Sequence, residues 1–279
     1  MKVSFIGAGI VGTAFGLYIK SFHEVLYYHS RTMASAIRAA NKVNAKPTND
    51  LKLLIEDSEV IFITTNDQNI EIVVKEIIDL NMTCENKYFL HMSGALSSEI
   101  LLPLKDKGGK IASMHPLQTF PTPEKGFAHL SSAYFALEGQ CEFLIDWLKD
   151  LGNPYFVLEG HQKSQYHMAA CIFSNYLVTL MAFGSNMLKA IGIDEKQGLR
   201  AMLPLVQATL NNVMTLGPEA ALTGPLKRGD LLTLENHMKN VEGLNLSLYQ
   251  TLMAWTSENL IDDPNQVEML KALWRTHES

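Results

Sequence analysis

Two side chains that can carry a proton stand four residues apart where a long helical stretch begins. Lys163 and His167 fall on one face of that helix, because residues four apart lie one turn from each other. The pair suits reduction of a carbonyl group. The ammonium of Lys163 can donate a hydrogen bond or a proton to the developing alkoxide while the second group fixes the substrate. His167 is either that second group or the acid itself. The alternatives are a solvated lysine and a packing histidine.

Three further polar residues in the C-terminal half are candidates for substrate binding. Asn175 lies among very apolar residues of the same helical stretch, so its amide must be paired with the substrate or with another helix. The segment Thr223–Asp230 joins two helical stretches and carries two cations and an acid. Its Arg228 can bind a carboxylate through two parallel hydrogen bonds. Asp230 contacts substrate or caps the helix expected from Leu231.

A G-x-G-x-x-G sequence near the N-terminus follows a strand-like run and opens a helical one, which is the context of a dinucleotide-binding loop. Gly7 permits the tight turn, Gly9 lets the backbone approach a pyrophosphate, and Gly12 lets the helix pack against the strand. Free N–H groups and the helix dipole favour the phosphate charge. An ordinary strand-to-helix turn is the alternative. We expect the cofactor to bind on Gly7, Ala8, Gly9, Ile10, Val11 and Gly12.

The end of the second strand-like run indicates which dinucleotide binds. An NAD site usually has an acidic residue there for the ribose hydroxyl, but no acid lies between Val25 and Thr32. Arg31 can form two hydrogen bonds to a phosphate, and Ser30 and Thr32 can add hydroxyl donors. The sequence therefore predicts a preference for NADP(H), with a solvated loop arginine as the alternative.

Polar and small residues follow three later strand-like runs. In open parallel sheets, ligands bind at the carboxyl ends of the strands. We therefore expect a cofactor cleft at this edge of the sheet, although loop residues without a binding role are the alternative for each position. The candidates for cofactor contact are Thr65, Asn66, Ser93 and His115.

These residues need a scaffold, and the pattern of the chain changes near residue 160. Before it, continuous apolar runs alternate with helical stretches, which indicates a parallel sheet covered on both faces. The expected strands are Lys2–Ile6, Val25–His29, Val60–Thr65, Tyr88–Met92, Lys110–Met114 and Ala133–Leu137. After it, the chain is expected to be helical at 161–191, 196–216, 231–243, 244–259 and 265–277. We predict an α/β Rossmann-type domain, residues 1–160, followed by an all-α domain for substrate binding and dimerisation, residues 161–279.

Composition excludes several other classes. The chain has 279 residues and a net charge of −6, from 23 Lys and Arg against 29 Asp and Glu, which does not suit a general nucleic-acid binder. The three cysteines are widely spaced, form no C-x-x-C pair, and suit a reducing compartment, so we expect no metal site and a cytoplasmic location. The most apolar stretch, Met168–Phe183, is shorter than the ~20 residues of a spanning helix, so we expect a buried helix and no membrane partner.

Several segments together resemble one family. They are GAGIVG, the HSR ending of the second strand, HMSG, SMHPLQTF, KSQYHMAACIFSNYLV and ALTGPLKRGD. The chain is similar over nearly its whole length to Rossmann-like oxidoreductases with a 6-phosphogluconate-dehydrogenase-like helical second domain, formerly catalogued as a domain of unknown function. Relatives include pyrroline-5-carboxylate reductase and ketopantoate reductase.

The resemblance implies an NADPH-dependent reductase of a small 2-oxo acid, with ketopantoate to pantoate as the favoured instance, and a homodimer. Lys163 matches the catalytic lysine of ketopantoate and β-hydroxyacid reductases. One turn later these relatives carry Asn, where this chain has His167, so the identity of the proton donor stays open. The subgroup carries a Tyr-His pair at this point, here Tyr166 and His167. The alternative functions are reduction of an imine such as pyrroline-5-carboxylate, and regulatory NADP(H) binding without turnover.

Overall fold

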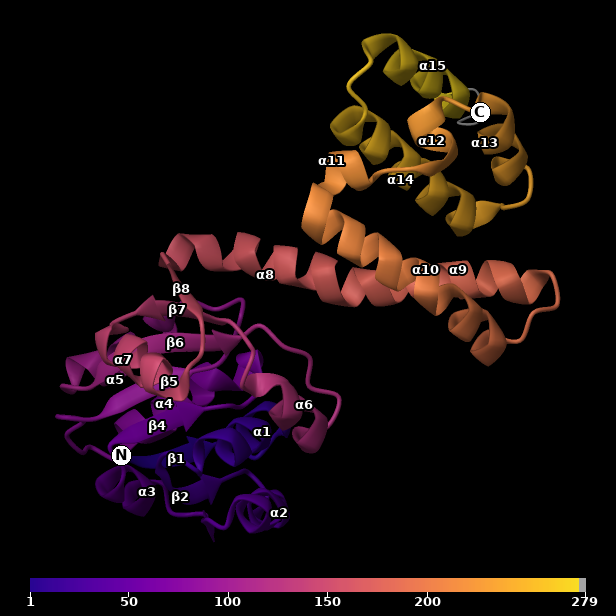
Figure 1. The fold of residues 1–279 in the computed structure, drawn as a ribbon. Coiled ribbons are helices and arrows are strands. Elements are labelled where there is room, and N and C mark those ends of the chain that lie inside the picture. The colour runs from indigo at the N-terminus through magenta and orange to yellow at the C-terminus, as the bar shows by residue number, and fades with distance from the viewer. Residues whose placement is uncertain (276–279) are drawn as a thin grey trace. The chain divides into compact units, whose positions relative to one another are not determined.

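The protein, described by a computed structural model for residues 1–275, contains an eight-stranded sheet in its N-terminal half (Figure 1). The strand order is β3-β2-β1-β4-β5-β6-β7-β8. The strands are β1 (Lys2–Ile6), β2 (Glu24–His29), β3 (Lys46–Thr48), β4 (Val60–Ile63), β5 (Tyr88–His91), β6 (Lys110–Pro116), β7 (Phe135–Gly139) and β8 (Tyr155–Leu158). The sequence predicted six of these strands. It missed β3 and β8, which form the two edges of the sheet.

One strand pair departs from the expected parallel arrangement. Six neighbouring pairs run parallel, but β7 runs antiparallel to β6, with Ser113 opposite Glu138. The connection from β6 to β7 contains the helix α6 (Pro123–Leu130). It returns to the sheet on the side where β6 ends, so that β7 starts beside the carboxyl end of β6. The chain must then run in the opposite direction. The sheet is therefore mixed, within an α/β architecture of the Rossmann type.

Helices cover both faces of this sheet, and each face has its own apolar core. Side chains alternate along a strand, so Phe62 of β4 joins the core formed with α1, α2, α6 and α7, whereas Ile61 and Ile63 join the core formed with α3, α4 and α5. Burial on both sides explains the continuous apolar runs of the sequence. The helices are α1 (Ile10–Ile19), α2 (Met33–Val43), α3 (Leu51–Asp57), α4 (Ile70–Asp79), α5 (Leu102–Asp106) and α7 (Glu142–Leu151).

The C-terminal part of the chain is helical, as the sequence predicted. It begins with a continuous helical stretch made of a 3₁₀ turn (Gly160–Gln162), α8 (Lys163–Cys171), a π-helical turn (Ile172–Tyr176) and α9 (Leu177–Ala190). The helices that follow are α10 (Glu195–Leu216), α11 (Pro218–Ala221), α12 (Gly224–Arg228), α13 (Leu231–Met238), α14 (Gly243–Leu260) and α15 (Pro264–Arg275). The last expected helix extends to His277, and its final two residues lie outside the described part.

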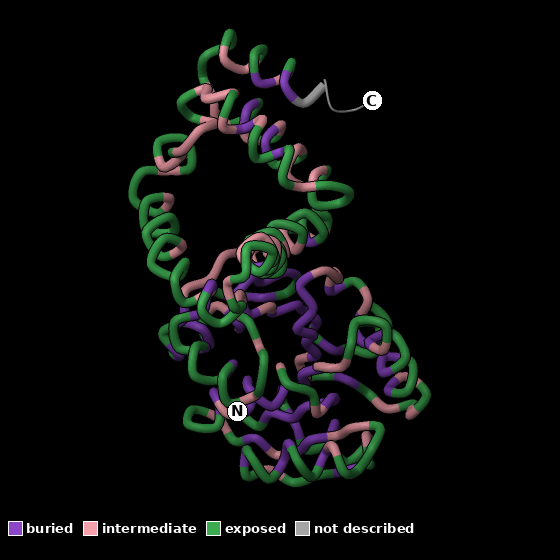
Figure 2. Tube along the Cα trace, turned by 90° about the vertical axis from the view of Figure 1, so that its right-hand side faces the viewer, coloured by how far each residue is buried: buried purple, intermediate pink, exposed green. Residues whose placement is uncertain are grey.

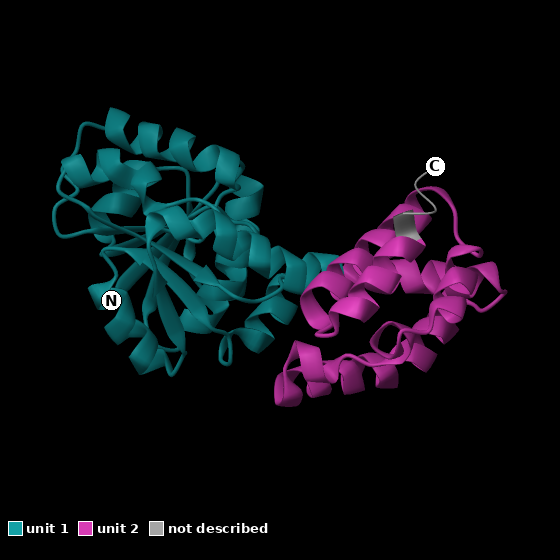
Figure 3. Cartoon of the chain, turned by 90° about the horizontal axis from the view of Figure 1, so that it is seen from above, with its two compact units in different colours: residues 1–176 teal, residues 177–279 magenta. Residues whose placement is uncertain are grey.

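The chain divides into two compact units, Met1–Tyr176 and Leu177–Ser279 (Figure 3). The first unit includes the sheet and α8, so the division falls inside the long helix, whereas the change of pattern in the sequence falls at its start. The second unit has a small core of its own, built from α13, α14 and α15 and consisting of Leu234, Met238, Met253, Leu270 and Leu273.

The long helix is not buried as we expected from its apolar sequence. Among the described residues, Gly160–Ala190 is long and apolar enough to cross a membrane by length and composition, and 6% of its most apolar window is buried inside the chain. Figure 2 shows this helix and much of the second unit as mainly exposed, in contrast to the sheet. The expectation failed because apolar composition predicts that a surface is covered, and does not predict that the same chain covers it.

Candidate active site

The glycine loop between β1 and α1 has the geometry that a dinucleotide needs. Gly7 has a φ of +116°, and a Cβ there would lie 2.6 Å from the backbone of Thr64. A Cβ on Gly12 would lie 2.3 Å from Oγ1 of Thr64, so this glycine lets α1 pack closely against the end of β4. Around Gly9 the space is open, because the nearest atom to a Cβ there is the Thr64 carbonyl oxygen at 3.8 Å.

Gly9 is also the N-cap of α1, and no side chain caps its free N–H groups. The first turn of α1 contains no acidic residue. An exposed helix N-terminus with open space in front of it suits a pyrophosphate. The three glycines therefore fit the roles expected from the sequence: a turn, an open approach, and close packing.

The end of β2 lies beside this loop, since Ile6 of β1 pairs with His29 of β2 and the Gly7 N–H donates to the His29 carbonyl at 2.8 Å. Ser30 is half-buried and Arg31 is exposed. The fold thus brings the predicted phosphate-binding arginine next to the pyrophosphate loop. A single guanidinium at this position can bind the additional phosphate that distinguishes NADP(H) from NAD(H).

Lys163 is deeply buried at the start of α8. The side chain is 1% exposed, and Nζ donates to the Ser113 hydroxyl at 2.5 Å and to the Ser93 carbonyl at 2.8 Å. These bonds tie α8 to β6 and to the loop after β5. Burial lowers the pKa of Lys163 to about 8, although Glu138 and Asp67 act in the opposite direction. The sequence alternative of a solvated lysine is therefore wrong.

A buried carboxylate lies close to this ammonium. Glu138, on β7, accepts hydrogen bonds from the backbone N–H and hydroxyl of Ser98 at 2.6 and 3.0 Å and from the Ser97 hydroxyl at 3.2 Å. Because Ser113 and Glu138 are cross-strand partners, the antiparallel β7 places an anion near the lysine. A buried charge needs such compensation. The sequence analysis assigned no role to either residue: Ser113 begins the SMHPLQTF segment but was not a candidate, and Glu138 lies in no motif.

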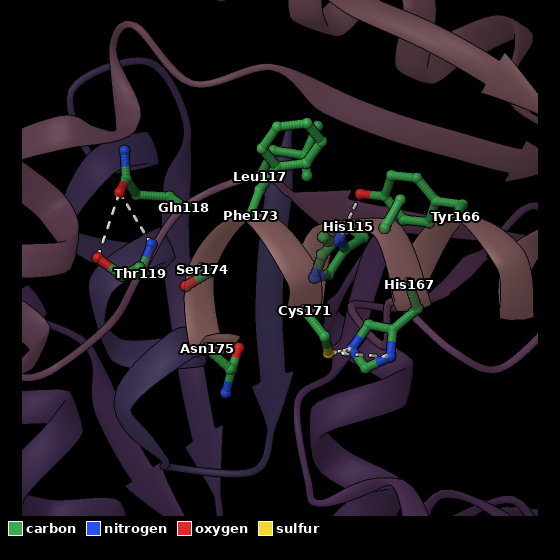
Figure 4. A pocket seen from close by; sticks show the side chains of 12 residues that line it. His115, Leu117, Gln118, Thr119, Tyr166, His167, Cys171, Phe173, Ser174 and Asn175 are labelled. Carbon is green, nitrogen blue, oxygen red and sulfur yellow. Dashed lines mark hydrogen bonds between the residues drawn. The ribbon is translucent and has the colours of Figure 1, made fainter. Parts of the chain in front are cut away.

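A pocket of about 560 Å³ opens beside α8, within the first unit (Figure 4). Nδ1 of His115, near the end of β6, lies 2.6 Å from the Tyr166 hydroxyl of α8, and the two rings meet edge to face. His167 also lines the pocket, with Nδ1 3.9 Å from Sγ of Cys171. The remaining lining residues are Leu117, Gln118, Thr119, Ala169, Ala170, Phe173, Ser174 and Asn175.

Two buried histidines of this region, His115 and His91, resist protonation. Burial lowers the pKa of His115 to about 3, and the positive charge of Lys163 adds to this effect. Burial and Lys163 likewise lower the pKa of His91, which is fully buried, to about 4. Burial raises the pKa of Tyr166. Near neutral pH the imidazoles of His115 and His91 are therefore neutral, and the phenol of Tyr166 keeps its proton.

The helix is locally distorted where it borders the pocket. The π-helical turn Ile172–Tyr176 contains Ser174 and Asn175, which line the pocket. Single π turns in α-helices commonly occur at functional sites, since the extra residue per turn changes where side chains point. For Asn175 the sequence predicted a paired amide within an apolar helix; the structure places the residue in the pocket lining, where it is exposed.

The other predicted residues have varied environments. Ser93 is buried, and its hydroxyl donates to Asp67 at 2.8 Å while accepting two backbone N–H groups of its own turn. Oγ1 of Thr65 is buried without a partner among the described atoms, and Asn66 is exposed. In the second unit, Arg228 is exposed, and the Asp230 carboxylate accepts the Thr233 N–H at 3.1 Å, which confirms Asp230 as the cap of α13.

Comparison with known proteins agrees with this two-part architecture. Residues 1–116 match a Rossmann-like domain, and residues 133–256 match a domain of unknown function, DUF2520. The chain combines a Rossmann-like domain with a DUF2520 domain. No curated protein matches the sequence significantly.

Solved structures show the same fold along the whole chain. A protein from Thermotoga maritima is 27% identical, covers 99% of this chain and 100% of its own, and has a TM-score of 0.68. A candidate NADP oxidoreductase from Bacteroides fragilis is 22% identical, with coverages of 92% and 98% and a TM-score of 0.73. A reductive aminase from Aspergillus terreus, in complex with NADPH and ethyl-5-oxohexanoate, is 15% identical, with coverages of 99% and 99% and a TM-score of 0.71. The chain therefore shares the fold of these three proteins over nearly its whole length.

Proposed function

We propose that this protein is an NADPH-dependent reductase that reduces the C=N bond of a small, largely apolar imine. The observation that carries the proposal is that the glycine loop and a pocket lie at the carboxyl ends of the strands of one sheet. The pocket is lined by the Tyr166 phenol and the His115 imidazole. The bound cofactor would supply hydride to the carbon of the substrate. The protein must then orient the substrate, limit its contact with water, and provide a proton for the nitrogen.

Residues of the chain fit two phosphate-bearing parts of NADPH, the pyrophosphate and the additional ribose phosphate. The open space at Gly9 and the uncapped start of α1 would hold the pyrophosphate. Arg31 and Ser30, which follow β2, would bind the additional phosphate. The names of the Bacteroides and Aspergillus proteins, which refer to NADP and to an NADPH complex, support the same cofactor.

The lining of the pocket favours an imine over a 2-oxo acid. The twelve residues that line it include no Lys or Arg, and Leu117 and Phe173 give it apolar walls. The carboxylate of a 2-oxo acid would need a cation or several N–H donors in place of such a lining. The resemblance to a reductive aminase points in the same direction. Ketopantoate, expected from the sequence, carries such a carboxylate.

We also propose that the protein forms a homodimer through its long helices. Val178 of α9 and Met214 of α10 are 68% and 84% exposed, together with several other apolar side chains on these helices. Exposed apolar surface of this extent marks an interaction surface. A second copy is the expected partner because the family that the sequence resembles dimerises through its helical domain.

The decisive experiment is a substrate panel that follows the oxidation of NADPH by its absorbance. The panel contains preformed cyclic imines including pyrroline-5-carboxylate, ketones mixed with amines, ketopantoate and other 2-oxo acids. We expect turnover with carboxylate-free imines and with ketone–amine mixtures, and much slower turnover of pyrroline-5-carboxylate, whose carboxylate meets no Lys or Arg in the pocket lining. Preferential turnover of ketopantoate or another 2-oxo acid would show that the proposed substrate class is wrong. If nothing is reduced while NADPH raises the melting temperature, the protein binds the cofactor without catalysis.

A further inference from the structure

Lys163 and His167 are the two proton donors expected from the sequence, and only His167 lines the pocket. Lys163 does not line it, and its ammonium donates to the Ser113 hydroxyl and the Ser93 carbonyl inside the protein. Moving this side chain toward a substrate would break both bonds and leave a buried carbonyl without its donor. Lys163 is thus built into the scaffold of the site.

Tyr166, three residues further along α8, is placed differently. Its side chain lines the pocket, and its hydroxyl meets Nδ1 of His115 at 2.6 Å. The ring is held on two sides, edge to face, by His115 at 5.6 Å and by Phe156 of β8 at 5.7 Å between ring centroids. Figure 4 shows the phenol oxygen directed at the imidazole beside the open pocket. A fixed phenol at the wall of a pocket can donate a proton to a substrate.

From this geometry we propose that Tyr166 is the proton donor of the reduction and that His115 is the positioning residue that orients its hydroxyl. This inference rests on the proposed function. The nitrogen of the C=N bond takes the phenolic proton, and the carbon gains hydrogen and two electrons from the reduced cofactor. Tyr166 is left as a phenolate, which takes a proton from water once the product leaves.

The groups around this pair support the assignment. Nδ1–H of a neutral His115 can donate to the phenol oxygen, which leaves the phenolic proton free for the substrate and stabilises the phenolate that forms. The charged and titratable groups that face His115 are Lys163 and His167 from α8 and His91 from β5. Burial, with a smaller contribution from the Lys163 charge, lowers the pKa of His115 and keeps its imidazole neutral, so that Nδ1 can carry the hydrogen it donates.

His167 is the rival donor, since it lines the same pocket. Its nearest polar contact is the thiol of Cys171, with Sγ–N distances of 3.9 and 4.0 Å, which are weak interactions. Among the described residues, no carboxylate or hydroxyl forms a hydrogen bond that orients its ring. A general acid in catalysis needs a defined direction toward its acceptor, and only Tyr166 has one here.

The test compares Tyr166→Phe, His167→Gln and a control, Tyr176→Phe, a tyrosine that is 58% exposed on the same helix. For the best imine of the panel, kcat and KM are measured with NADPH, and NADPH affinity and melting temperature are measured for each variant. We expect Tyr166→Phe to lower kcat about 100-fold or more, with unchanged cofactor affinity and melting temperature. Tyr176→Phe is expected to match the parent.

His115 is tested with two substitutions, because only one of them keeps a donor near the position of Nδ1. His115→Asn is expected to retain much more kcat than His115→Leu, a difference that a purely structural role would not produce if both variants melt at the same temperature. If Tyr166→Phe keeps the parental kcat, or if His167→Gln loses more than Tyr166→Phe, the proposal is overturned while the reductase function stands. If the parent reduces no member of the panel, both fail together.

Discussion

The Lys163 ammonium donates to the Ser113 hydroxyl at 2.5 Å and thereby joins the first turn of α8 to the middle of the sheet. Ser113 lies opposite Glu138 on the antiparallel strand β7. A helix that carries the wall of the pocket is therefore fixed to the strand that carries His115. This connection places Tyr166 and His115 within hydrogen-bonding distance, and it gives Lys163 a measurable effect on stability.

Replacing Lys163 by Met is expected to change how stability depends on pH. In the folded protein the pKa of Lys163 is lowered to about 8 from its ordinary value of 10.5. Between these values the unfolded chain holds a proton that the folded chain does not, so the contribution of Lys163 makes the protein more stable as the pH rises through this range. Urea unfolding at a series of pH values should show a shallower rise in Lys163→Met. Lys149→Met, at an exposed site, should keep the parental slope.

The imidazole of His115 is expected to remain neutral well below the usual range of histidine. Burial and the Lys163 charge lower its pKa to about 3 from an ordinary value of 6.5. As the pH falls from 6.5 toward 3, the unfolded chain gains a proton that the folded chain lacks, and stability is lost. Nitrogen NMR should show no titration of His115 between pH 5 and 8. Observation of its titration in that range would contradict the described environment.

Substitution of Gly9 by Ala is expected to weaken NADPH binding without harming the fold. A Cβ at this position finds open space, so the free protein can accommodate it, but it enters the space that the pyrophosphate needs. We expect a loss of affinity of about tenfold or more, which corresponds to about 1.4 kcal/mol. Gly184→Ala, where a Cβ also meets open space within a helix, is the matched control and should bind NADPH normally.

Arg31→Ala is expected to reduce the discrimination between the two nicotinamide dinucleotides. The guanidinium can bind the phosphate of NADPH that NADH lacks, so the affinity for NADPH should fall by about tenfold or more while that for NADH is unchanged. Binding is measured by titration of cofactor fluorescence. The control is Arg38→Ala, since the Arg38 guanidinium already donates to the Ser35 hydroxyl at 2.8 Å. If the parent binds NADPH and NADH with equal affinity, Arg31 does not bind the additional phosphate.

Charges placed on the exposed faces of α9 and α10 are expected to dissociate the proposed dimer. The combined substitution Val178→Glu and Met214→Glu puts two carboxylates on surfaces that are 68% and 84% exposed in one chain. Light scattering should give the mass of a dimer for the parent and that of a monomer for the variant, because an unpaired charge is costly to bury. Ile72→Glu, at a 54% exposed position on α4, should remain dimeric.

Local rules were enough to predict the cofactor loop and much of the fold. The turn at Gly7, the open approach at Gly9 and the packing at Gly12 depend on residues close in sequence, and the alternation of apolar runs with helices indicates a covered sheet. The edge strand β3 was missed because it has three residues and contains Pro47. Apolar composition alone could not show that the long helix has little cover within its own chain.

The chemistry of the site depends on contacts between residues far apart in the sequence. Spacing placed Lys163 and His167 on one face of a helix, but it could not show that Lys163 points into the protein while Tyr166 meets His115, 51 positions away. Nor could it assign an electrostatic role to Glu138, whose position follows from the reversed direction of β7. The sequence by itself determined the two-part fold and the geometry of the glycine loop, because both follow from local periodicity and glycine conformation. The tertiary structure decided which polar groups are buried, paired or exposed to a substrate, because burial and pairing depend on non-local packing.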